Sequence, residues 1–268
     1  MNAALQHLQA AAPALLGGVT VTIIVALFAI VLSMCLAIPA GLGRISRSGV
    51  IRSVSTLYVE VVRGTPLLLQ LYVWFYGVNI LLGILFNFNI DQTIYNILTA
   101  LNSNSLAPKQ DVSGFFFGVV GLSVNYGAYL AEVIRAGILA VDTGQGEAAA
   151  TLGMSRWQTM RLIVLPQALR IMVPPLTNNF ITLVQDTSFL QVLGVAELSL
   201  VSFANAQSTS NTSVRWGFFG TELVVYFVIC YSIALVARRF EANNSLGIAP
   251  RRSIMGGALS LARRPRAG

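Results

Sequence analysis

Four ionisable side chains lie inside otherwise apolar stretches of this 268-residue sequence, namely Glu132, Arg135, Asp186 and Glu222. Charged groups are expensive to place in hydrocarbon, so such residues are functional candidates. Glu132 and Arg135 are three residues apart, and in a helix this spacing brings them onto one face, where they can pair. The favoured interpretation of this pair is a structural salt bridge, with a gating role as the alternative. Glu222 comes near the end of its apolar stretch, where partial hydration favours a structural role.

Asp186 belongs to a stripe of polar residues. The spacing of its members, i, i+4, i+7 and i+8, places them on one side of a helix. They are Asn178, Thr182, Gln185 and Asp186, with Asn179 close to the same side. A polar stripe that crosses a membrane must face protein or water. Two interpretations stay open: the stripe lines a path for a polar solute, or it makes the interhelical hydrogen bonds that hold subunits together.

Residues typical of catalytic or metal sites are scarce. His7 is the only histidine, and Cys35 and Cys230 fall inside apolar blocks, where free cysteine behaves as a small hydrophobe. Lys109 is the only lysine, so the sequence has no Gly-x-x-x-x-Gly-Lys-Ser/Thr nucleotide loop. We therefore expect no catalytic residue, no metal and no cofactor bound by this chain. A membrane-bound enzyme is the least favoured function.

The composition is that of an integral membrane protein. Hydrophobic residues make up 55% of the chain and charged residues 10%, with a mean hydropathy of +0.72. A soluble domain would carry about a quarter charged residues. The apolar blocks approach the ~20 residues that span a bilayer as a helix. We predict an all-α membrane protein with five transmembrane helices, at about 15–40, 65–86, 114–139, 171–194 and 216–237.

The arginines indicate the orientation of these spans. Most of them fall in segments 41–64, 140–170 and 238–268, and cytoplasmic loops collect basic residues. The N-terminus is therefore predicted outside, with an outer tail at 1–14, and the C-terminus in the cytoplasm. The transmembrane domain would cover 15–240, and the Arg-rich segment 241–268 would be a disordered cytoplasmic tail. The net charge of +7 then serves orientation and contact with membrane lipid rather than binding of nucleic acid.

Three further features complete the predicted architecture. Short helices are expected on the outer side at about 90–101 and 196–208. Pro174 and Pro175 are expected to kink or unwind the start of the fourth span. The sequence shows no internal repeat, and five helices do not comfortably enclose a gated path, which favours an assembly of two such chains.

The segment 140–170 has the signals of two short helices joined by a tight turn. Asp142 with Gln145, and Ser155 with Gln158, have the spacing of a helix N-cap and its reciprocal partner. Gly153 stands where the first helix should end in a left-handed cap. The alanines at 148–150 leave a smooth surface that can lie closely against another protein.

This segment resembles the signature of the permease subunits of ABC importers. That signature has Glu-Ala-Ala, a glycine four residues after the second alanine, and then Ile-x-Leu-Pro. Every position is met, by Glu147, Ala148, Ala149, Gly153, Ile163, Leu165 and Pro166. The resemblance implies a cytoplasmic pair of coupling helices that docks into an ATPase subunit. The residues implied for this contact are Glu147, Ala148, Ala149, Gly153, Ser155 and Trp157.

Segments outside the coupling loop narrow the family. Residues 60–70, 126–138, 178–188 and 221–223 resemble permeases for polar amino acids of the histidine, glutamine and arginine type, and the resemblance runs in order over about 15–240. Gln185 departs from it, because many relatives have lysine there. The resemblance implies a type I importer fold in a bacterial inner membrane. It also implies three partners: an ATP-binding subunit dimer that holds ATP and Mg, a second permease subunit, and an external solute-binding protein.

Two alternatives to polar amino acids remain at this point. One is a permease for another small solute, such as an opine-like conjugate or a phosphonate. The other is an ion-driven secondary transporter, which would have no reason to keep the coupling segment. The identity of the solute, and whether the second permease is a copy of this chain or a relative, stay open.

Overall fold

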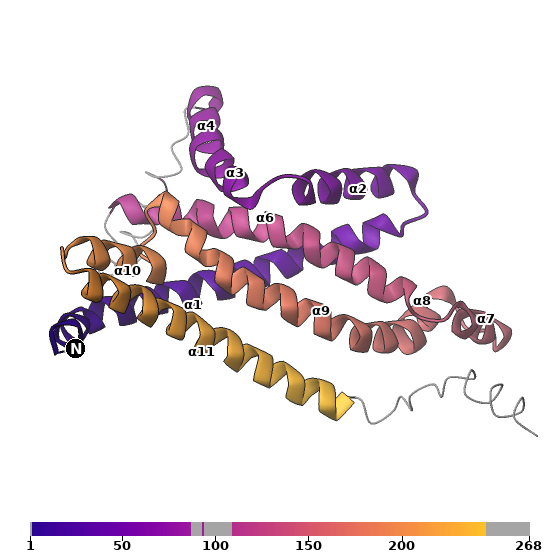
Figure 1. Cartoon of the computed structure of the whole chain (residues 1–268). Helices are drawn as coiled ribbons and strands as arrows, with labels where there is room; N and C mark the ends of the chain where they lie inside the picture. The colour runs from indigo at the N-terminus through magenta and orange to yellow at the C-terminus, as the bar shows by residue number, and fades with distance from the viewer. Residues whose placement is uncertain (1, 87–92, 94–108, 245–268) are drawn as a thin grey trace, which may run out of the picture.

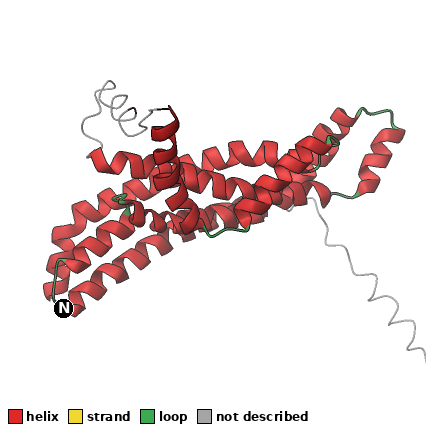
Figure 2. Cartoon of the chain, turned by 90° about the horizontal axis from the view of Figure 1, so that it is seen from above, coloured by secondary structure: helices red, strands yellow, loops and turns green. Residues whose placement is uncertain are grey.

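The computed structural model describes residues 2–86, 93 and 109–244, and this part of the chain is an elongated bundle of helices (Figure 1 and Figure 2). The α-helices are α1 (Asn2–Arg44), α2 (Gly49–Arg63), α3 (Leu67–Tyr72), α4 (Asn79–Phe86), α6 (Lys109–Leu139), α7 (Thr143–Thr151), α8 (Arg156–Thr159), α9 (Leu165–Asp186), α10 (Leu198–Gln207) and α11 (Thr212–Asn244). Three helical segments with a different winding adjoin these α-helices: the wider π-helices η1 (Val73–Val78) and η2 (Met160–Val164), and the tighter 3-10 helix η3 (Thr187–Leu193).

Four helical stretches of the described residues are long and apolar enough to cross a bilayer: Leu5–Arg44, Leu67–Leu85, Ser113–Leu139 and Thr212–Arg239. A fifth is obtained when Arg156–Leu193 and Leu198–Gln207, which meet at 52°, are taken as one broken span. The predicted all-α membrane fold is therefore confirmed, with four spans or with the predicted five if the broken pair counts as one span. Its orientation in the membrane stays a prediction.

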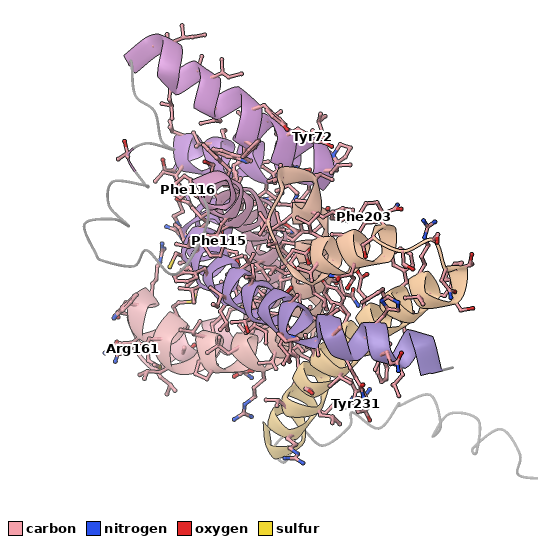
Figure 3. All side chains as sticks on the ribbon, turned by 90° about the vertical axis from the view of Figure 1, so that its left-hand side faces the viewer. Tyr72, Phe115, Phe116, Arg161, Phe203 and Tyr231 are labelled. Atoms are coloured by element: carbon pink, nitrogen blue, oxygen red, sulfur yellow. The ribbon has the colours of Figure 1, made fainter. Side chains whose placement is uncertain are left out.

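Helix α6 is the centre of the bundle. In its most apolar window 72% of the residues are buried, against 6% in the corresponding window of α11. Leu122 and Leu130 of α6 are fully buried, the first in a cluster with Leu183 of α9 and the second in a cluster with Val59 of α2. The outside of the bundle is covered by apolar and aromatic side chains, such as Tyr231 on α11 (Figure 3). This exposure is what a bilayer solvates.

Close packing of α1 on α6 depends on a glycine. A Cβ atom at Gly41 would lie 2.7 Å from the backbone oxygen of Ala131, an atom that cannot move aside. We therefore expect Gly41→Ala to push the two helices apart and to destabilise the fold by about 1–3 kcal/mol. Gly17→Ala on the same helix is the matched control, because nothing lies within 4 Å of its Cβ position. Thermal unfolding of the two purified variants measures the difference, and equal melting temperatures would contradict the packing.

The segment 1–14, predicted as an outer tail, is helical from Asn2 onward, and its location outside the membrane stays a prediction. Helix α1 already begins at Asn2, and Ala11 and Leu15 pack with Leu198 of α10 and Val214 of α11. The Ala- and Leu-rich composition of this segment gives it a high helix propensity, and these apolar partners bury one of its sides.

The prediction of a loop at 41–64 followed by a span at 65–86 also needs correction. Residues 49–63 form α2, and the Tyr58 hydroxyl donates to the carbonyl oxygen of Val124 at 2.7 Å. Val124 is close to the middle of the span Ser113–Leu139, so α2 lies along that span instead of outside it. The chain then turns between α2 and α3 (Figure 1). Because the segment 41–64 contains several charged residues, its hydropathy is too low to predict a helix that lies along a membrane span.

The fourth span begins earlier than predicted and is not unwound at its prolines. Helix α9 starts at Leu165 and continues through both Pro174 and Pro175 to Asp186. The irregular turn is the π-helix η2, which precedes α9. Proline has a φ near the helical value, and neighbouring groups in a membrane bundle can satisfy the carbonyls that it frees.

The remaining elements agree with the sequence in part. Helix α10 corresponds to the short helix predicted at 196–208, and α6 and α11 contain the third and fifth spans. Helix α11 continues to Asn244, so the first residues of the predicted tail 241–268 are helical. The helix predicted at 90–101, apart from residue 93, and residues 245–268 lie outside the described residues.

Candidate functional site

The segment between α6 and α9 folds as the predicted pair of short helices, α7 and α8, at one end of the bundle (Figure 1). The Asp142 carboxylate caps α7 by accepting from the backbone N–H of Gly144 at 2.8 Å, so its partner is Gly144 and not the predicted Gln145. Ser155 caps α8 in a complete capping box. Its hydroxyl accepts from the Gln158 N–H at 3.3 Å, and the Gln158 side chain accepts from the Ser155 N–H at 2.8 Å.

Gly153 makes the turn between the two helices. Its φ is +75°, a left-handed conformation that favours glycine. The N–H groups of Gly153 and Met154 donate to the carbonyls of Ala150 and Ala149, at 3.0 and 3.1 Å. Helix C-caps of this kind satisfy carbonyls that have no partner in the last turn. The predicted role of Gly153 in the turn is confirmed.

The side chains of this pair divide into a buried and an exposed set. Ala149 is only 1% exposed and lies inside the chain, so its methyl group is not on the outer surface. Glu147, Ala148 and Ser155 are exposed. Leu152 and Trp157 are 80% and 70% exposed, which is unusual for large apolar groups unless a partner or a membrane covers them. Within residues 143–170, Glu147 is the only acidic residue, whereas Arg156, Arg161 and Arg170 are basic.

The polar stripe of α9 is brought together only in part. Asn178, Thr182 and Gln185 are exposed in the protomer. Asn179 is half-buried and donates to the Pro175 carbonyl of its own helix at 2.8 Å. Asp186 turns instead towards α6 and accepts from the Tyr126 hydroxyl at 2.6 Å. The stripe therefore presents amides and a hydroxyl on its open side, while its carboxylate is held by a neighbouring helix.

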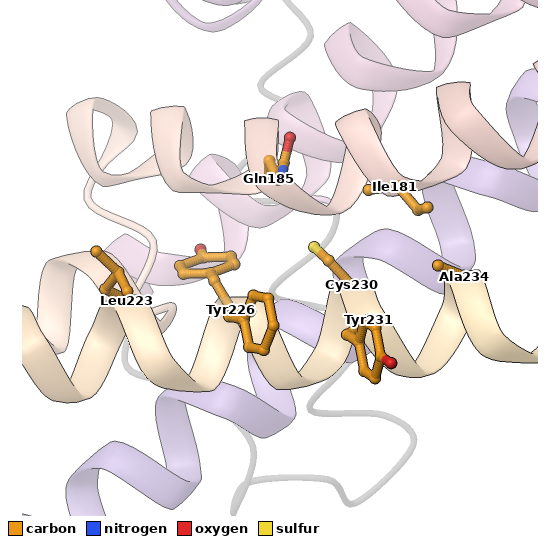
Figure 4. Close-up of a pocket in the computed structure, with 8 residues that line it drawn as sticks. Ile181, Gln185, Leu223, Tyr226, Cys230, Tyr231 and Ala234 are labelled. Atoms are coloured by element: carbon orange, nitrogen blue, oxygen red, sulfur yellow. The ribbon is translucent and has the colours of Figure 1, made fainter.

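An apolar groove of about 450 Å³ lies between α9 and α11 and meets the stripe at Gln185 (Figure 4). Gln185 from α9 and Tyr226, Cys230 and Tyr231 from α11 line it. The groove is open along the bundle and holds few polar groups. By itself it fits a packing surface better than an enclosed solute site.

The predicted ion pair between Glu132 and Arg135 is present and belongs to a larger network. Arg135 makes two hydrogen bonds to the Glu132 carboxylate, at 2.5 and 2.9 Å. Arg44 at the end of α1 bridges Glu132 at 2.8 Å and Glu60 of α2 at 2.7 Å. The network ties three helices together near the α7–α8 end. Arg44 and Glu60 were not predicted as members, because these partners are far apart in the chain.

The break between α2 and α3 is stabilised by the Gln70 side chain, for which no role was predicted. Pro66 has no N–H to give to the carbonyl of Val62, four residues before it. The Gln70 amide nitrogen donates to that carbonyl at 2.7 Å and to the Thr65 hydroxyl at 2.8 Å. Its amide oxygen accepts from Asn125 of α6 at 3.1 Å. The spacing of Pro66 and Gln70, four residues apart, was the feature of the sequence that could have predicted this hydrogen bond.

A second missed site lies at the opposite end of the bundle. Glu197 is fully buried and caps α10, accepting from the N–H groups of Ser199 and Leu200 at 2.8 Å each. The Tyr226 hydroxyl donates to the same carboxylate at 3.0 Å, and Ser199 donates to Glu222 at 2.6 Å. Glu222 thus has the structural role predicted for it. These bonds attach α10 to α11, and no periodicity in the sequence indicated them.

Comparison with known proteins agrees with this geometry. Residues 29–244 match the family described as binding-protein-dependent transport system inner membrane component. The L-cystine transport system permease protein TcyB of Bacillus subtilis is 35% identical over 231 residues, covering 85% of this chain and 86% of the relative. The glutamine transport system permease protein GlnP of Escherichia coli is 29% identical, covering 86% of this chain and 93% of the relative.

Solved structures share the fold. An amino acid ABC transporter crystallised with histidines superimposes with a TM-score of 0.68 at 30% identity, covering 87% of this chain and 94% of that one. A chain of the inward-facing MetNI methionine ABC transporter gives a TM-score of 0.61 at 20% identity, covering 86% and 95%, which is a likeness of fold alone. The chain belongs to the family of binding-protein-dependent transport system inner membrane components, the multi-pass permease subunits of ABC importers.

Proposed function

We propose that this permease, with a second permease subunit and an ATPase dimer, imports a polar amino acid that an external binding protein delivers through a bacterial inner membrane. The observation that carries the proposal is the α7–α8 pair, with its capped helices and its exposed Glu147 and Trp157. Relatives named as permeases for cystine, glutamine, and glutamate and aspartate support the amino-acid class. ATP and Mg would be held by the ATPase.

The surface proposed to contact the ATPase is the open side of α7 together with the start of α8. Residues two apart in a helix point to nearly opposite sides. Buried Ala149 therefore marks the side of α7 that faces its own chain, and Glu147 lies on the other side, beside exposed Ala148. Trp157 would supply an apolar anchor of the kind that dominates interface energies. Gly153 and Ser155 contribute by shaping the turn, and Ala149 by packing within the pair.

The translocation path is proposed to follow the open side of α9. An exposed amide in a span is unfavourable towards lipid, which applies to Asn178. The Thr182 hydroxyl already donates to the Asn178 carbonyl at 3.0 Å, and the Gln185 side chain hydrogen-bonds Cys230, so these two groups are polar but partnered. A second permease lying against α9 and α11 would enclose them. Asn179 and Asp186 are the less exposed members of the path, and Asp186 would act from its position beside Tyr126.

Uptake into vesicles tests this function. We expect the purified chain to bring an ATPase subunit with it in mild detergent. Once reconstituted with the binding protein, the complex should take up labelled L-cystine, L-glutamine or L-glutamate only when ATP is present. Asp186→Ala should reduce uptake while the assembly stays intact, with Ser232→Ala on α11 as the control, because the Ser232 hydroxyl bonds only its own helix at Val228.

Two outcomes would replace the proposal. Uptake that a proton or sodium gradient drives without ATP would indicate a secondary transporter. Uptake of a phosphonate or an opine-like conjugate, and of no amino acid, would keep the ABC mechanism and change the solute. Unchanged uptake by Asp186→Ala would remove that residue from the path.

A further inference from the structure

A second apolar groove lies between α9 and α11, closer than the first to the end of the bundle where α7 and α8 lie (Figure 1). Its volume is about 570 Å³, and its walls are Val173 and Phe180 from α9 and Ile233, Val236 and Ala237 from α11. The two hydroxyl groups in its lining donate to carbonyls of their own helices, so they need no further partner. The groove can therefore hold a hydrocarbon chain without leaving a polar group unpaired.

This second groove is on a different side of α9 from the polar stripe. At about 100° per residue, the α9 residues that line it point about 140° away from the exposed residues of the stripe. A second permease that covers the stripe would therefore leave this groove open to the surrounding membrane.

Two arginines lie beyond one end of the second groove. Helices α9 and α11 are antiparallel, since the α9 residues that line the two grooves rise in number where those of α11 fall. Arg170 comes three residues before Val173, and Arg239 comes three residues after Val236, so each shares a side of its helix with the lining. Arg239 is also the last residue of the span Thr212–Arg239, which places this end of the groove at the edge of the hydrocarbon.

The length of the groove matches one leaflet of a bilayer. Phe180, at the other end of the α9 wall, is ten residues from Arg170, which is about 15 Å along the helix. A hydrocarbon core is about 30 Å thick, so this length is half of it. An acyl chain that enters beside the arginines would therefore reach the end of the groove near the middle of the membrane.

The two arginines have no carboxylate partner within the described residues. Both side chains are exposed, and none of the ion pairs in the described ranges includes either of them. Helix α9 has no acidic residue before Asp186, and α11 has none between Glu222 and Glu241. Both guanidiniums are therefore available to an anion from outside the chain.

We propose that this groove binds an anionic phospholipid, with an acyl chain between α9 and α11 and the phosphate on Arg170 and Arg239. Burial of the chain against the apolar walls and charge-assisted hydrogen bonds from the guanidiniums to the phosphate both favour this occupant. Two cations select a lipid with a net negative charge over a zwitterionic one. The bound lipid joins α9 to α11 at the end of the bundle where the α7–α8 pair lies.

Thermal stabilisation of the purified, delipidated full-length permease tests this assignment. The probes are dioleoyl phosphatidylglycerol, dioleoyl phosphatidylcholine with the same chains, and inorganic phosphate. We expect phosphatidylglycerol to raise the melting temperature of the wild type, and the other two probes to raise it much less. The double variant Arg170→Gln/Arg239→Gln should need at least a tenfold higher concentration of phosphatidylglycerol for half-maximal stabilisation. Arg238→Gln is the matched control and should respond as the wild type does, because Arg238 points away from the groove at about 100° per residue.

A second pair of variants tests the groove without changing any charge. Val236 is 55% exposed, so Val236→Trp should fill the groove, leave the helix folded and weaken the response to phosphatidylglycerol at least tenfold. Leu235→Trp is the control, because Leu235 is 40% exposed and does not line the groove. It should respond as the wild type does.

Several results would overturn the proposal. A wild type that phosphatidylglycerol does not stabilise, or that both lipids stabilise equally, has no site for an anionic lipid. Equal stabilisation by inorganic phosphate would indicate a site for a free anion. An equal loss in Arg238→Gln and in the double variant would indicate a general effect of surface charge. If Val236→Trp splits a two-permease assembly on a sizing column, or binds phosphatidylglycerol as the wild type does, the groove is not where the lipid binds.

Discussion

Glu147→Arg is expected to abolish capture of the ATPase by the tagged permease and, with it, ATP-driven uptake. Glu147 is the only acidic residue in 143–170, and it lies on the exposed side of α7, opposite buried Ala149. Reversing a charge inside a protein interface costs on the order of 3 kcal/mol, which corresponds to about a 100-fold loss of affinity. Quantitative pull-down of the ATPase, followed by uptake in vesicles, measures the loss.

Gln145→Arg is the matched control for this prediction. It introduces the same side chain into the same helix, but two residues away and on the side of Ala149. Helix α7 should stay folded in both variants, because neither touches the cap at Asp142 or the turn at Gly153. Capture that is equally strong in the two variants would show that the ATPase does not contact the Glu147 side of α7.

Glu132→Leu should produce the largest loss of stability in this protein. The substitution removes the carboxylate that Arg44 and Arg135 share, at side-chain exposures of 12% and 30%. With Arg63 nearby, three guanidiniums would then face only Glu60. Removing one partner from a partly buried charge cluster costs about 3 kcal/mol or more. The folded yield in detergent and the melting temperature should both fall sharply.

Two variants calibrate this result. Glu60→Leu should cost less than about 1 kcal/mol, because the Glu60 side chain is 61% exposed and its pair with Arg44 is solvated. Glu132→Gln should fall between the two, since an amide oxygen accepts one of the three hydrogen bonds. If Glu132→Leu melts no lower than Glu60→Leu, the network does not hold α1, α2 and α6 together.

Local signals accounted for the parts of the structure that the sequence predicted well. The turn at Gly153, the capping box of Ser155 and Gln158, and the Glu132–Arg135 pair all depend on residues at most five positions apart. The apolar blocks located the third and fifth spans, because lipid requires length and hydrophobicity from each helix on its own. Such features need no knowledge of what packs against them.

The errors came from interactions between distant segments. Helix α2 carries Arg52, Glu60 and Arg63, and it lies along a span only because Tyr58 and the Arg44 network find partners on other helices. Arg44 and Glu132 are 88 residues apart, and Glu197 depends on Tyr226 of another helix. No spacing rule relates such positions in a single sequence.

The candidate path shows the same division. Periodicity placed Asn178, Thr182 and Gln185 on one side of α9, and they are exposed together. It also placed Asp186 there, but the Tyr126 hydroxyl draws that carboxylate towards α6. The burial of Ala149 could not be predicted either, because a run of alanines does not indicate which methyl group faces inward.

Helical structure continues almost without interruption from Arg156 in α8 to Leu193 at the far end of the bundle. At about 1.5 Å per residue this is a rod of roughly 57 Å that begins beside the capped turn. Such a rod acts as a lever, since each degree of tilt at α8 displaces the far end by about 1 Å. A rotation of a few degrees imposed at the α7–α8 end would therefore move Gly194 and the adjoining α10 by up to several ångström, less whatever bending the π-helix η2 takes up.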